Sequence, residues 1–355
     1  MKILVIQQKR VGDVVVSSAL CNNLRKHLPD AEIHYQIFSF TKDVAFGNPN
    51  IDKLILFEDS DREPVNLLRF ALRIRRSAYD VVIDAYSKME SRLITMLSGA
   101  NERISFRSHF GIYNVVVPVQ VYPPDSCGMA LADRLNLLKP ILGEDVYLDP
   151  QHRMFLSQDE IEQGRRLLEA QGVDPQEPIA VFGIFGSLVE KSYPEDYMQS
   201  LLAWFQDQYD MQIMLNYFPE QSADARRFYE SMKNKTSVFP EFGNHSLRDL
   251  ARMLSFATLY IGNDSGHPHI AKSMSVPTFT LFAPFVSRYS WGVLDELDMH
   301  DSADIGDLLP DETKHLHWKQ IRVDNPRWYR RMIPELIIGR MENWLRQFET
   351  AKRGG

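Results

Sequence analysis

The chain has 355 residues and a mass of 41.1 kDa, more than one hydrophobic core usually organises, so two domains are expected. Its 44% hydrophobic and 25% charged residues are typical of a folded globular protein and exclude disordered and fibrous classes. The net charge of −7 excludes bulk nucleic-acid binding, which needs a strongly basic domain.

The first half of the chain alternates predicted strands and helices. The opening strand, 3–7, is an uninterrupted apolar run, and apolar residues recur at helical spacing in the segment 14–28. Such alternation is typical of βαβ units around a mostly parallel sheet. The other elements expected here are strands at 32–38, 53–57 and 79–86 and helices at 66–76, 90–99 and 127–142.

A turn-rich stretch at 143–157 lacks a helical period, and we place the domain boundary near 145–157. The second half then repeats the alternation. Its expected elements are strands at 178–183, 211–218, 258–262 and 276–282 and helices at 195–209, 246–257, 266–274 and 334–348. The sequence therefore predicts an α/β protein with two doubly wound domains, 1–150 and 151–330, followed by a C-terminal helix within 331–355.

Neither cysteine has a partner at a diagnostic spacing. Cys21 and Cys127 lie far apart without a CxxC pattern, so neither a disulfide framework nor a zinc site is expected. No run of about 18 apolar residues is present, and the apolar stretch after Met1 is too short for a signal peptide. We therefore expect the protein to stay in the cytoplasm.

Ligands of open α/β sheets bind beyond the carboxyl ends of the strands. The first such loop, 7–13, ends in Gly12-Asp13, where a carboxylate at a helix start is favoured by capping and by the helix dipole. Asp13 is thus either a helix cap or a functional carboxylate. The loop lacks the GxGxxG pattern, so a dinucleotide-dependent dehydrogenase is poorly supported.

The loop after the strand 178–183 contains two glycines, Ser187 and Lys191. Accessible backbone N–H groups and one cation are what a phosphate cradle needs, although the Walker A order is missing. An ordinary connecting loop is the alternative.

A third loop, 262–269, places small residues and Asp264 at a helix start. Its N–H groups could bind an anionic phosphate, and Asp264 could accept hydrogen bonds from sugar hydroxyls or cap the helix. His267 and His269 are two residues apart and would not face the same side of a helix, so a histidine metal pair is not expected.

Two segments at this spacing resemble glycosyltransferase family 9, the ADP-heptose:lipopolysaccharide heptosyltransferases. They are MKILVIQQKRVGDVVVSSAL at the start and YIGNDSGHPHIAKSMSVPTFTLFAP at 260–284. The family's Gly-Asp corresponds to Gly12-Asp13, and its Asp-(Thr/Ser)-Gly-x-x-His-x-Ala pattern begins at Asp264. The stretch YDVVIDAY at 79–86 and Lys191 before Tyr193-Pro194 also resemble family segments. The resemblance covers about residues 1–300.

The resemblance implies the GT-B fold, with two Rossmann-like domains facing each other across a cleft. The N-terminal domain, 1–150, would bind the acceptor and the C-terminal domain, 151–330, the nucleotide-sugar. The implied reaction is an inverting, metal-independent transfer of heptose from ADP-heptose to the lipopolysaccharide core, with no cofactor. Asp13 would be the general base that deprotonates the acceptor hydroxyl. The helix within 331–355 is expected to pack back on the N-terminal domain.

The resemblance also supplies a set of binding residues. Lys191 and the N–H groups around Ser265 and Gly266 would stabilise the leaving diphosphate. The full donor-side set is Ser187, Lys191, Glu220, His245, Asp264, Ser265, Gly266 and His269. On the acceptor side, where a phosphate-rich lipopolysaccharide core needs cations, the expected residues are Lys9, Arg10, Gly12, Lys88 and Arg107.

The chain departs from the family pattern on the donor side. The stretch 215–219 lacks the family's glycine, Tyr193 replaces its usual tryptophan, and Ala283 stands where glycine is usual. These differences leave Asp13 unchanged.

The N-terminal part is the more basic one: residues 1–145 carry 18 Lys and Arg against 17 Asp and Glu, and the remainder 22 against 30. Four arginines, at 69, 73, 75 and 76, fall in one predicted helix. They either bind the anionic acceptor and support peripheral contact with the inner membrane, or form the solvated face of an amphipathic helix.

Two other functions remain open at this point. A nucleotide-sugar 2-epimerase of the same fold would turn over the donor without any acceptor. A non-catalytic nucleotide-sugar-binding protein would bind the donor without forming product, and its binding would not depend on Asp13.

Overall fold

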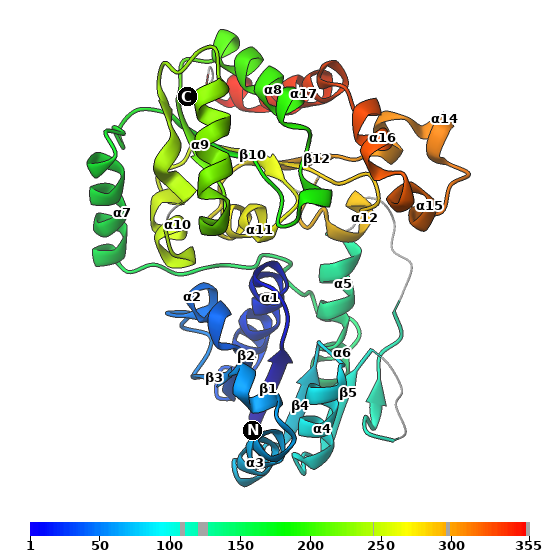
Figure 1. Cartoon of the computed structure of the whole chain (residues 1–355). Helices are drawn as coiled ribbons and strands as arrows, with labels where there is room; N and C mark the ends of the chain where they lie inside the picture. The colour runs from blue at the N-terminus through cyan, green and yellow to red at the C-terminus, as the bar shows by residue number, and fades with distance from the viewer. Residues whose placement is uncertain (107–110, 120–126, 244, 296–298, 353–355) are drawn as a thin grey trace. The chain divides into compact units, whose positions relative to one another are not determined.

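The computed structural model describes residues 1–106, 111–119, 127–243, 245–295 and 299–352 (Figure 1). The chain divides into two compact units, Met1–Phe155 and Leu156–Gly355. Each unit is an α/β domain with its own parallel sheet.

The sheet of the first unit has the strand order β3-β2-β1-β4-β5-β6, and the pairs are parallel. This is the strand order of the Rossmann fold, with its topological switch between β1 and β4. The strands are β1 (Lys2–Gln7), β2 (Glu32–Phe38), β3 (Lys53–Phe57), β4 (Val81–Asp84), β5 (Glu102–Ser105) and β6 (Val115–Val116).

The helices of this unit connect the strands. They are α1 (Val11–His27), α2 (Lys42–Ala45), α3 (Pro64–Arg76), α4 (Met89–Leu97), α5 (Met129–Asn136) and α6 (Lys139–Leu142), with short 3₁₀ turns η1 (Ser39–Thr41) and η2 (Asp59–Arg62). The single helix expected at 127–142 is wrong. It is split before Lys139 because Pro140 cannot donate a backbone hydrogen bond and disfavours a helical residue before it.

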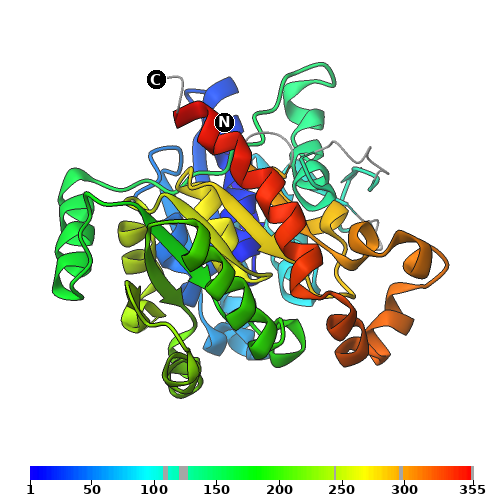
Figure 2. The ribbon, with the colours of Figure 1, turned by 90° about the horizontal axis from the view of Figure 1, so that it is seen from above.

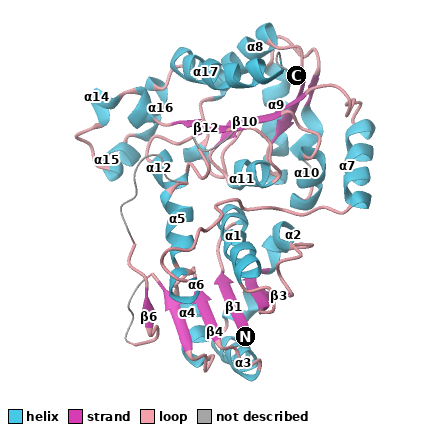
Figure 3. Cartoon of the chain, turned by 180° about the vertical axis from the view of Figure 1, so that it is seen from behind, coloured by secondary structure: helices cyan, strands magenta, loops and turns pink. Residues whose placement is uncertain are grey.

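The helices α3 and α4 pack against each other and against the sheet (Figure 3). The buried face of α3 consists of Leu67, Phe70, Ala71 and Ile74, which join a core with Leu4, Ile6, Val82 and Ile94. The remaining side chains of α3 lie on the opposite, exposed face.

The second unit repeats the topology, with the strand order β12-β11-β10-β7-β8-β9. The strands are β7 (Ile179–Gly183), β8 (Gln212–Asn216), β9 (Val238–Phe239), β10 (Leu259–Asn263), β11 (Thr278–Leu281) and β12 (His300–Ala303). The central strands β7 and β10 meet at two glycines: a Cβ atom on Gly262 would lie 2.7 Å from the Cα of Gly183. The predicted fold class, two Rossmann-like doubly wound domains, is confirmed.

The helices of the second unit that the sequence predicted are α8 (Glu195–Gln208), α10 (Leu247–Leu254), α11 (Gly266–Ser273) and α17 (Pro334–Lys352). Sequence periodicity did not indicate α7 (Gln158–Ala170), α9 (Ser222–Ser231), α12 (Arg288–Trp291), α13 (Ile305–Leu308), α14 (Pro310–Thr313), α15 (Trp318–Val323) and α16 (Asn325–Arg331). Short 3₁₀ turns are η3 (Val189–Lys191), η4 (Pro219–Gln221) and η5 (Pro240–Gly243). Within the described ranges, no helix is both long and apolar enough to cross a membrane.

The C-terminal helix α17 packs within the second unit. In α17, the buried side chains Ile337, Met341 and Trp344 belong to the core of the second unit, and the helix packs against α8 and β12 (Figure 2). The indole Nε1 of Trp344 donates a hydrogen bond to the carbonyl oxygen of Met299 at 3.0 Å. The apolar face of α17 is thus buried against the edge of the sheet, at β12.

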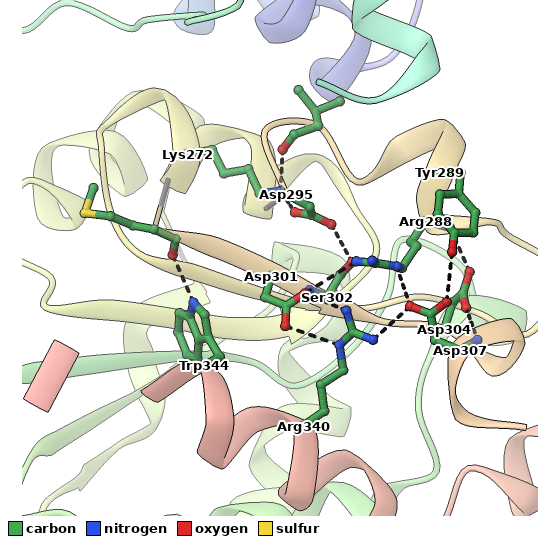
Figure 4. Close-up of polar contacts among 12 residues, drawn as sticks. Lys272, Arg288, Tyr289, Asp295, Asp301, Ser302, Asp304, Asp307, Arg340 and Trp344 are labelled. Atoms are coloured by element: carbon green, nitrogen blue, oxygen red, sulfur yellow. Dashed lines mark hydrogen bonds and ion pairs between the residues drawn. The ribbon is translucent and has the colours of Figure 1, made fainter. Parts of the chain in front are cut away.

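Partly buried ion pairs connect α17 to the last strand (Figure 4). Arg340 on α17 donates to Asp301 at 2.8 Å and to Asp307 at 2.8 Å. Arg288 also contacts both carboxylates, at 3.4 Å and 2.5 Å. The two guanidinium groups therefore share two carboxylates, which links α12, α13, β12 and α17.

A second buried pair lies next to this cluster (Figure 4). Lys272 on α11 is 2% exposed, and its Nζ contacts Asp295 Oδ1 at 2.5 Å and the carbonyl oxygen of Val293 at 2.6 Å. Asp295 also accepts a hydrogen bond from Ser302 on β12. Removing one partner of such a pair leaves an uncompensated charge in the core.

We expect Lys272→Met to lower the free energy of unfolding of the second unit by about 3–5 kcal/mol, because Asp295 would stay buried without its cation. Urea denaturation followed by tryptophan fluorescence measures this loss selectively, since all five tryptophans lie beyond residue 156. The matched control is Lys314→Met, whose exposed pair with Asp311 should contribute less than about 1 kcal/mol. Equal effects of the two substitutions would contradict the importance of the buried pair.

Candidate functional site

The first candidate group lies at the carboxyl end of β1, around Asp13. The helix α1 begins at Val11, so Gly12 and Asp13 lie in its first turn, and the N-cap position is occupied by Arg10 without a side-chain hydrogen bond. The interpretation of Asp13 as a simple N-cap is therefore wrong. Asp13 is only 6% exposed, and a carboxylate buried to this extent usually has charged partners.

Two cations hold the Asp13 carboxylate. Its Oδ1 accepts hydrogen bonds from Arg134 Nη2 at 2.7 Å and from Lys9 Nζ at 3.1 Å. Arg134 comes from α5 and is buried, whereas the Lys9 side chain is 45% exposed. Among the described residues both contacts fall on the same oxygen. The two contacts therefore fix the position of the carboxylate.

A buried carboxyl group also organises the neighbouring loop, after β4. Asp84 is fully buried and accepts hydrogen bonds from the backbone N–H groups of Ser87 at 2.7 Å and Tyr86 at 3.1 Å and from the Tyr113 hydroxyl at 2.6 Å. Burial raises the pKa of Asp84 despite these bonds. The loop leads to Lys88, which is exposed at the start of α4.

Three exposed cations of the first unit, Lys9, Arg10 and Lys88, lie at one sheet edge. Because β1 and β4 are parallel neighbours, with Ile6 opposite Asp84, the loops that carry Lys9, Arg10 and Lys88 leave the sheet side by side. Arg107, expected in the same group, lies outside the described residues.

The second candidate group lies at the carboxyl ends of β7 and β10. Lys191 Nζ forms an ion pair with the Oδ2 of Asp264, across 73 residues of sequence. The side chain of Asp264 is 8% exposed and that of Lys191 24%. The pair brings together two loops that the sequence only suggested separately.

The loop that carries Lys191 is fixed by the strand beneath it. The side chain of Asn263 accepts a hydrogen bond from the Tyr193 N–H at 2.7 Å and donates one to the carbonyl oxygen of Gly183 at 3.0 Å. The chain passes so close to itself that a Cβ atom on Gly186 would lie 2.4 Å from the Lys191 carbonyl oxygen. Ser187 belongs to the same loop and is partly exposed.

The start of α11 lies directly after Asp264. Ser265 is the N-cap, and its hydroxyl accepts a hydrogen bond from the His267 N–H at 3.2 Å. The interpretation of Asp264 as the helix cap is therefore wrong, because Ser265 takes that place. Gly266 is the first helical residue, and the N-terminal N–H groups of α11 are grouped beside the Lys191–Asp264 pair.

The two histidines of α11 contact different neighbours. His267 forms a hydrogen bond with Asn216 at 2.9 Å and stacks on Phe218, and burial lowers its pKa to about 4. The His269 ring lies edge-on to Trp291, with 6.1 Å between the ring centroids. The described residues contain no cluster of three or more His, Cys, Asp or Glu side chains placed to hold a metal ion.

Glu220 and His245 are connected to other parts of the second unit than the Lys191–Asp264 pair. Glu220 is exposed in η4, and its neighbour Gln221 donates to the carbonyl oxygen of Gly186 at 2.9 Å, which links η4 to the Lys191 loop. His245 forms a hydrogen bond with Gln171, at the end of α7, at 2.9 Å. Glu220 is therefore linked to the Lys191 loop through Gln221. His245 is held by the end of α7 instead.

The Lys191 loop is also held by residues of α15 and α16 that the sequence did not indicate. Asn325 donates a hydrogen bond to the carbonyl oxygen of Glu190 at 2.9 Å, and Arg322 contacts the Glu190 carboxylate at 2.6 Å. The Tyr193 hydroxyl donates to the Met332 carbonyl oxygen. Neither Asn325 nor Arg134 belongs to a recognisable motif, so no local pattern could have identified them.

Comparison with known proteins agrees with these features. The model of glycosyltransferase family 9 (heptosyltransferase) matches residues 67–300, more than half of the chain. The chain is 23% identical over 297 residues to lipopolysaccharide heptosyltransferase 1 of Campylobacter coli, covering 79% of this chain and 84% of that protein.

Two solved structures are similar in fold. A glycosyl transferase family 9 protein from Veillonella parvula superposes with a TM-score of 0.73 at 19% identity, covering 92% of this chain and 96% of the other. An ADP-heptose lipopolysaccharide heptosyltransferase II from E. coli superposes with a TM-score of 0.70 at 16% identity, covering 98% and 100%. The family match, together with this fold, shows that the chain is a glycosyltransferase and belongs to glycosyltransferase family 9, the heptosyltransferases.

Proposed function

We propose that the protein transfers a heptose from ADP-heptose to the lipopolysaccharide core, with inversion at the anomeric carbon and without a metal ion. The first unit binds the acceptor and the second the nucleotide-sugar. The observation that carries the proposal is the chemistry of the two groups: a buried carboxylate held by two cations in one unit, and a lysine beside a helix N-terminus in the other. The names of the similar proteins, lipopolysaccharide heptosyltransferases, support this donor and acceptor.

Asp13 acts as the general base. Because Arg134 and Lys9 both contact Oδ1, we assign Oδ2 as the oxygen that accepts the proton of the acceptor hydroxyl. As that proton moves to Asp13, the acceptor oxygen attacks the anomeric carbon from the face opposite ADP. The bond between this carbon and the phosphate oxygen breaks, and its electron pair leaves with ADP, which inverts the configuration.

The charge that develops on ADP is stabilised by Lys191 and by the first N–H groups of α11. A lysine is a mobile point charge, and a helix N-terminus presents aligned N–H donors to an anion. Lys191 is paired with Asp264 before the donor binds. We infer that the diphosphate takes over Lys191 and that Asp264 then accepts hydrogen bonds from the sugar hydroxyls.

The other donor-side residues take supporting roles. Ser187 faces the diphosphate from the Lys191 loop, Glu220 accepts hydrogen bonds from the ribose, and His245 lies beside the adenine. Ser265, Gly266 and His269 shape the start of α11. On the acceptor side, Lys9, Arg10, Lys88 and Arg107 bind phosphates of the core, while Gly12 lets the acceptor approach the backbone.

The acceptor is lipid-anchored, so the proposal places the enzyme in the cytoplasm with peripheral contact to the inner membrane. A 2-epimerase or a non-catalytic binding protein is less well supported, because the chain belongs to a family of transferases. Turnover of donor without an acceptor would favour the epimerase instead.

We expect Asp13→Asn to lower the rate of transfer by at least about 10²-fold, because the amide cannot accept the acceptor proton. Donor binding, measured by calorimetric titration, should stay within about twofold of wild type. The matched control is Asp30→Asn, which changes an exposed aspartate and should leave transfer unaffected. Near-normal transfer by Asp13→Asn would remove Asp13 from the role of base.

We expect Lys191→Met to weaken ADP binding by about 10-fold or more, the range for losing a charge-assisted hydrogen bond. Titration of wild type and variant with ADP and with UDP, each with and without EDTA, measures this loss. Wild type should prefer ADP, and EDTA should not change its affinity. Lys233→Met, at an exposed lysine of the same unit, is the control. Unchanged ADP affinity in Lys191→Met would detach this residue from the diphosphate, and loss of wild-type binding in EDTA would contradict metal independence.

A further inference from the structure

The exposed face of α3 is unusually apolar for a helix on a protein surface. Val65, Leu68 and Leu72 recur at three- and four-residue spacing, and they are 61%, 47% and 40% exposed. The opposite face of the same helix is buried in the core, so this stripe is not needed to hold α3 on the sheet. A solvent-facing helix would normally carry polar side chains at these positions.

The neighbouring helix α4 extends this surface. Met89 is 73% exposed at its start and Met96 is 48% exposed near its end, where Arg75 donates to the carbonyl oxygen of Leu97 at 3.3 Å. Of the 17 large hydrophobic side chains exposed in the described part of the chain, five lie on these two adjacent helices of 13 and 9 residues. Apolar side chains that are exposed together in this way are typical of an interaction surface, whereas singly scattered ones are not.

Arginines surround the apolar side chains. Arg69, Arg73 and Arg76 lie on the exposed face of α3, and Arg75 at its end, while residues 64–76 contain no acidic residue. Arg69 contacts Asn66 and Arg73 lies over the Phe70 ring, but within the described residues none of the four arginines forms an ion pair. Their charge is therefore available to an anionic partner.

We propose that this α3–α4 face binds the surface of a bilayer that carries anionic headgroups. The arginines bind headgroup phosphates, and the valine, leucine and methionine side chains enter the boundary between headgroups and acyl chains. The face is made of the convex sides of two helices, and flexible apolar side chains among cations suit a fluid interface better than a shaped protein partner. The positive charge of α3, which itself contains no acidic residue, supplies the complementarity.

The position of this face suits a lipid-anchored acceptor, and in this respect the inference rests on the proposed function. α3 joins the end of β3 to the start of β4, so its first turn lies at the carboxyl edge of the sheet. Met89 directly follows Lys88, one of the proposed acceptor contacts. A bilayer along α3 and α4 would therefore adjoin the edge at which Asp13 lies.

The test is co-sedimentation of the purified protein with vesicles. We expect wild type to bind vesicles of phosphatidylglycerol and phosphatidylethanolamine at least about 10-fold more tightly than vesicles of phosphatidylcholine, with affinity that falls as salt rises. The triple variant Arg69→Gln, Arg73→Gln, Arg76→Gln and the double variant Leu68→Gln, Leu72→Gln should each weaken binding at least about 10-fold.

Matched controls change the same kinds of residue elsewhere. They are the triple variant Arg166→Gln, Arg227→Gln, Arg346→Gln, whose side chains are 70–73% exposed, and the double variant Val119→Gln, Val323→Gln. Both controls should bind vesicles like wild type. All variants should transfer to a delipidated, soluble core fragment at rates within about twofold of wild type, which shows that they fold.

Equal binding of wild type to both kinds of vesicle, or unchanged binding of the two α3 variants, would overturn the inference. Vesicle binding and transfer to the soluble fragment are scored separately. Failure of wild type to transfer would contradict the proposed function, whereas loss of selective vesicle binding would contradict the membrane-binding face.

Discussion

The ion pair between Lys191 and Asp264 is the contact on which the second unit's candidate site depends. The two side chains come from loops after β7 and β10, and these strands are neighbours only because the sheet reverses its order there. Asn263 bonds to the backbone on both sides of this crossing, and glycines at 183, 186 and 262 remove the side chains that would keep the loops apart. The result is a cation held beside the N-terminus of α11. An anionic leaving group can bind there once Lys191 exchanges Asp264 for the phosphate.

The first unit holds a buried carboxylate between two cations. Asp13 accepts hydrogen bonds from Arg134 and Lys9, and this pairing offsets part of the cost of burying a charged group. Asp84, one strand away, accepts hydrogen bonds from backbone N–H groups and from the Tyr113 hydroxyl, and burial raises its pKa. Asp84 therefore shapes the loop before Lys88, whereas the two cations position Asp13 for the proposed role of base.

Much of the fold could be predicted from the sequence, because the central strands are buried on both faces and read as apolar runs. The strands β1, β4, β7 and β10 are of this kind. β5, with the sequence ERIS, and β12, with the sequence HDSA, were missed because their charged and polar residues break the run, and β6 and β9 are only two residues long. The sequence could single out Asp13, Lys191 and Asp264 as candidates because they lie in motifs at strand ends. Arg134 and Asn325 act through tertiary contacts from distant helices, and a single arginine or asparagine in a helix gives no local signal.

The proposed reaction moves a heptose from ADP-heptose to a lipopolysaccharide core with inversion. The most direct measurement is to incubate the protein with ADP-heptose and a heptose-deficient core, with EDTA present, and to determine the product by mass spectrometry and its anomeric configuration by NMR. The account predicts a core enlarged by one heptose, release of ADP, and an anomeric configuration opposite to that of the donor. A product with the configuration of the donor would contradict a single displacement assisted by Asp13, and consumption of ADP-heptose without any enlarged core would contradict the transferase function itself.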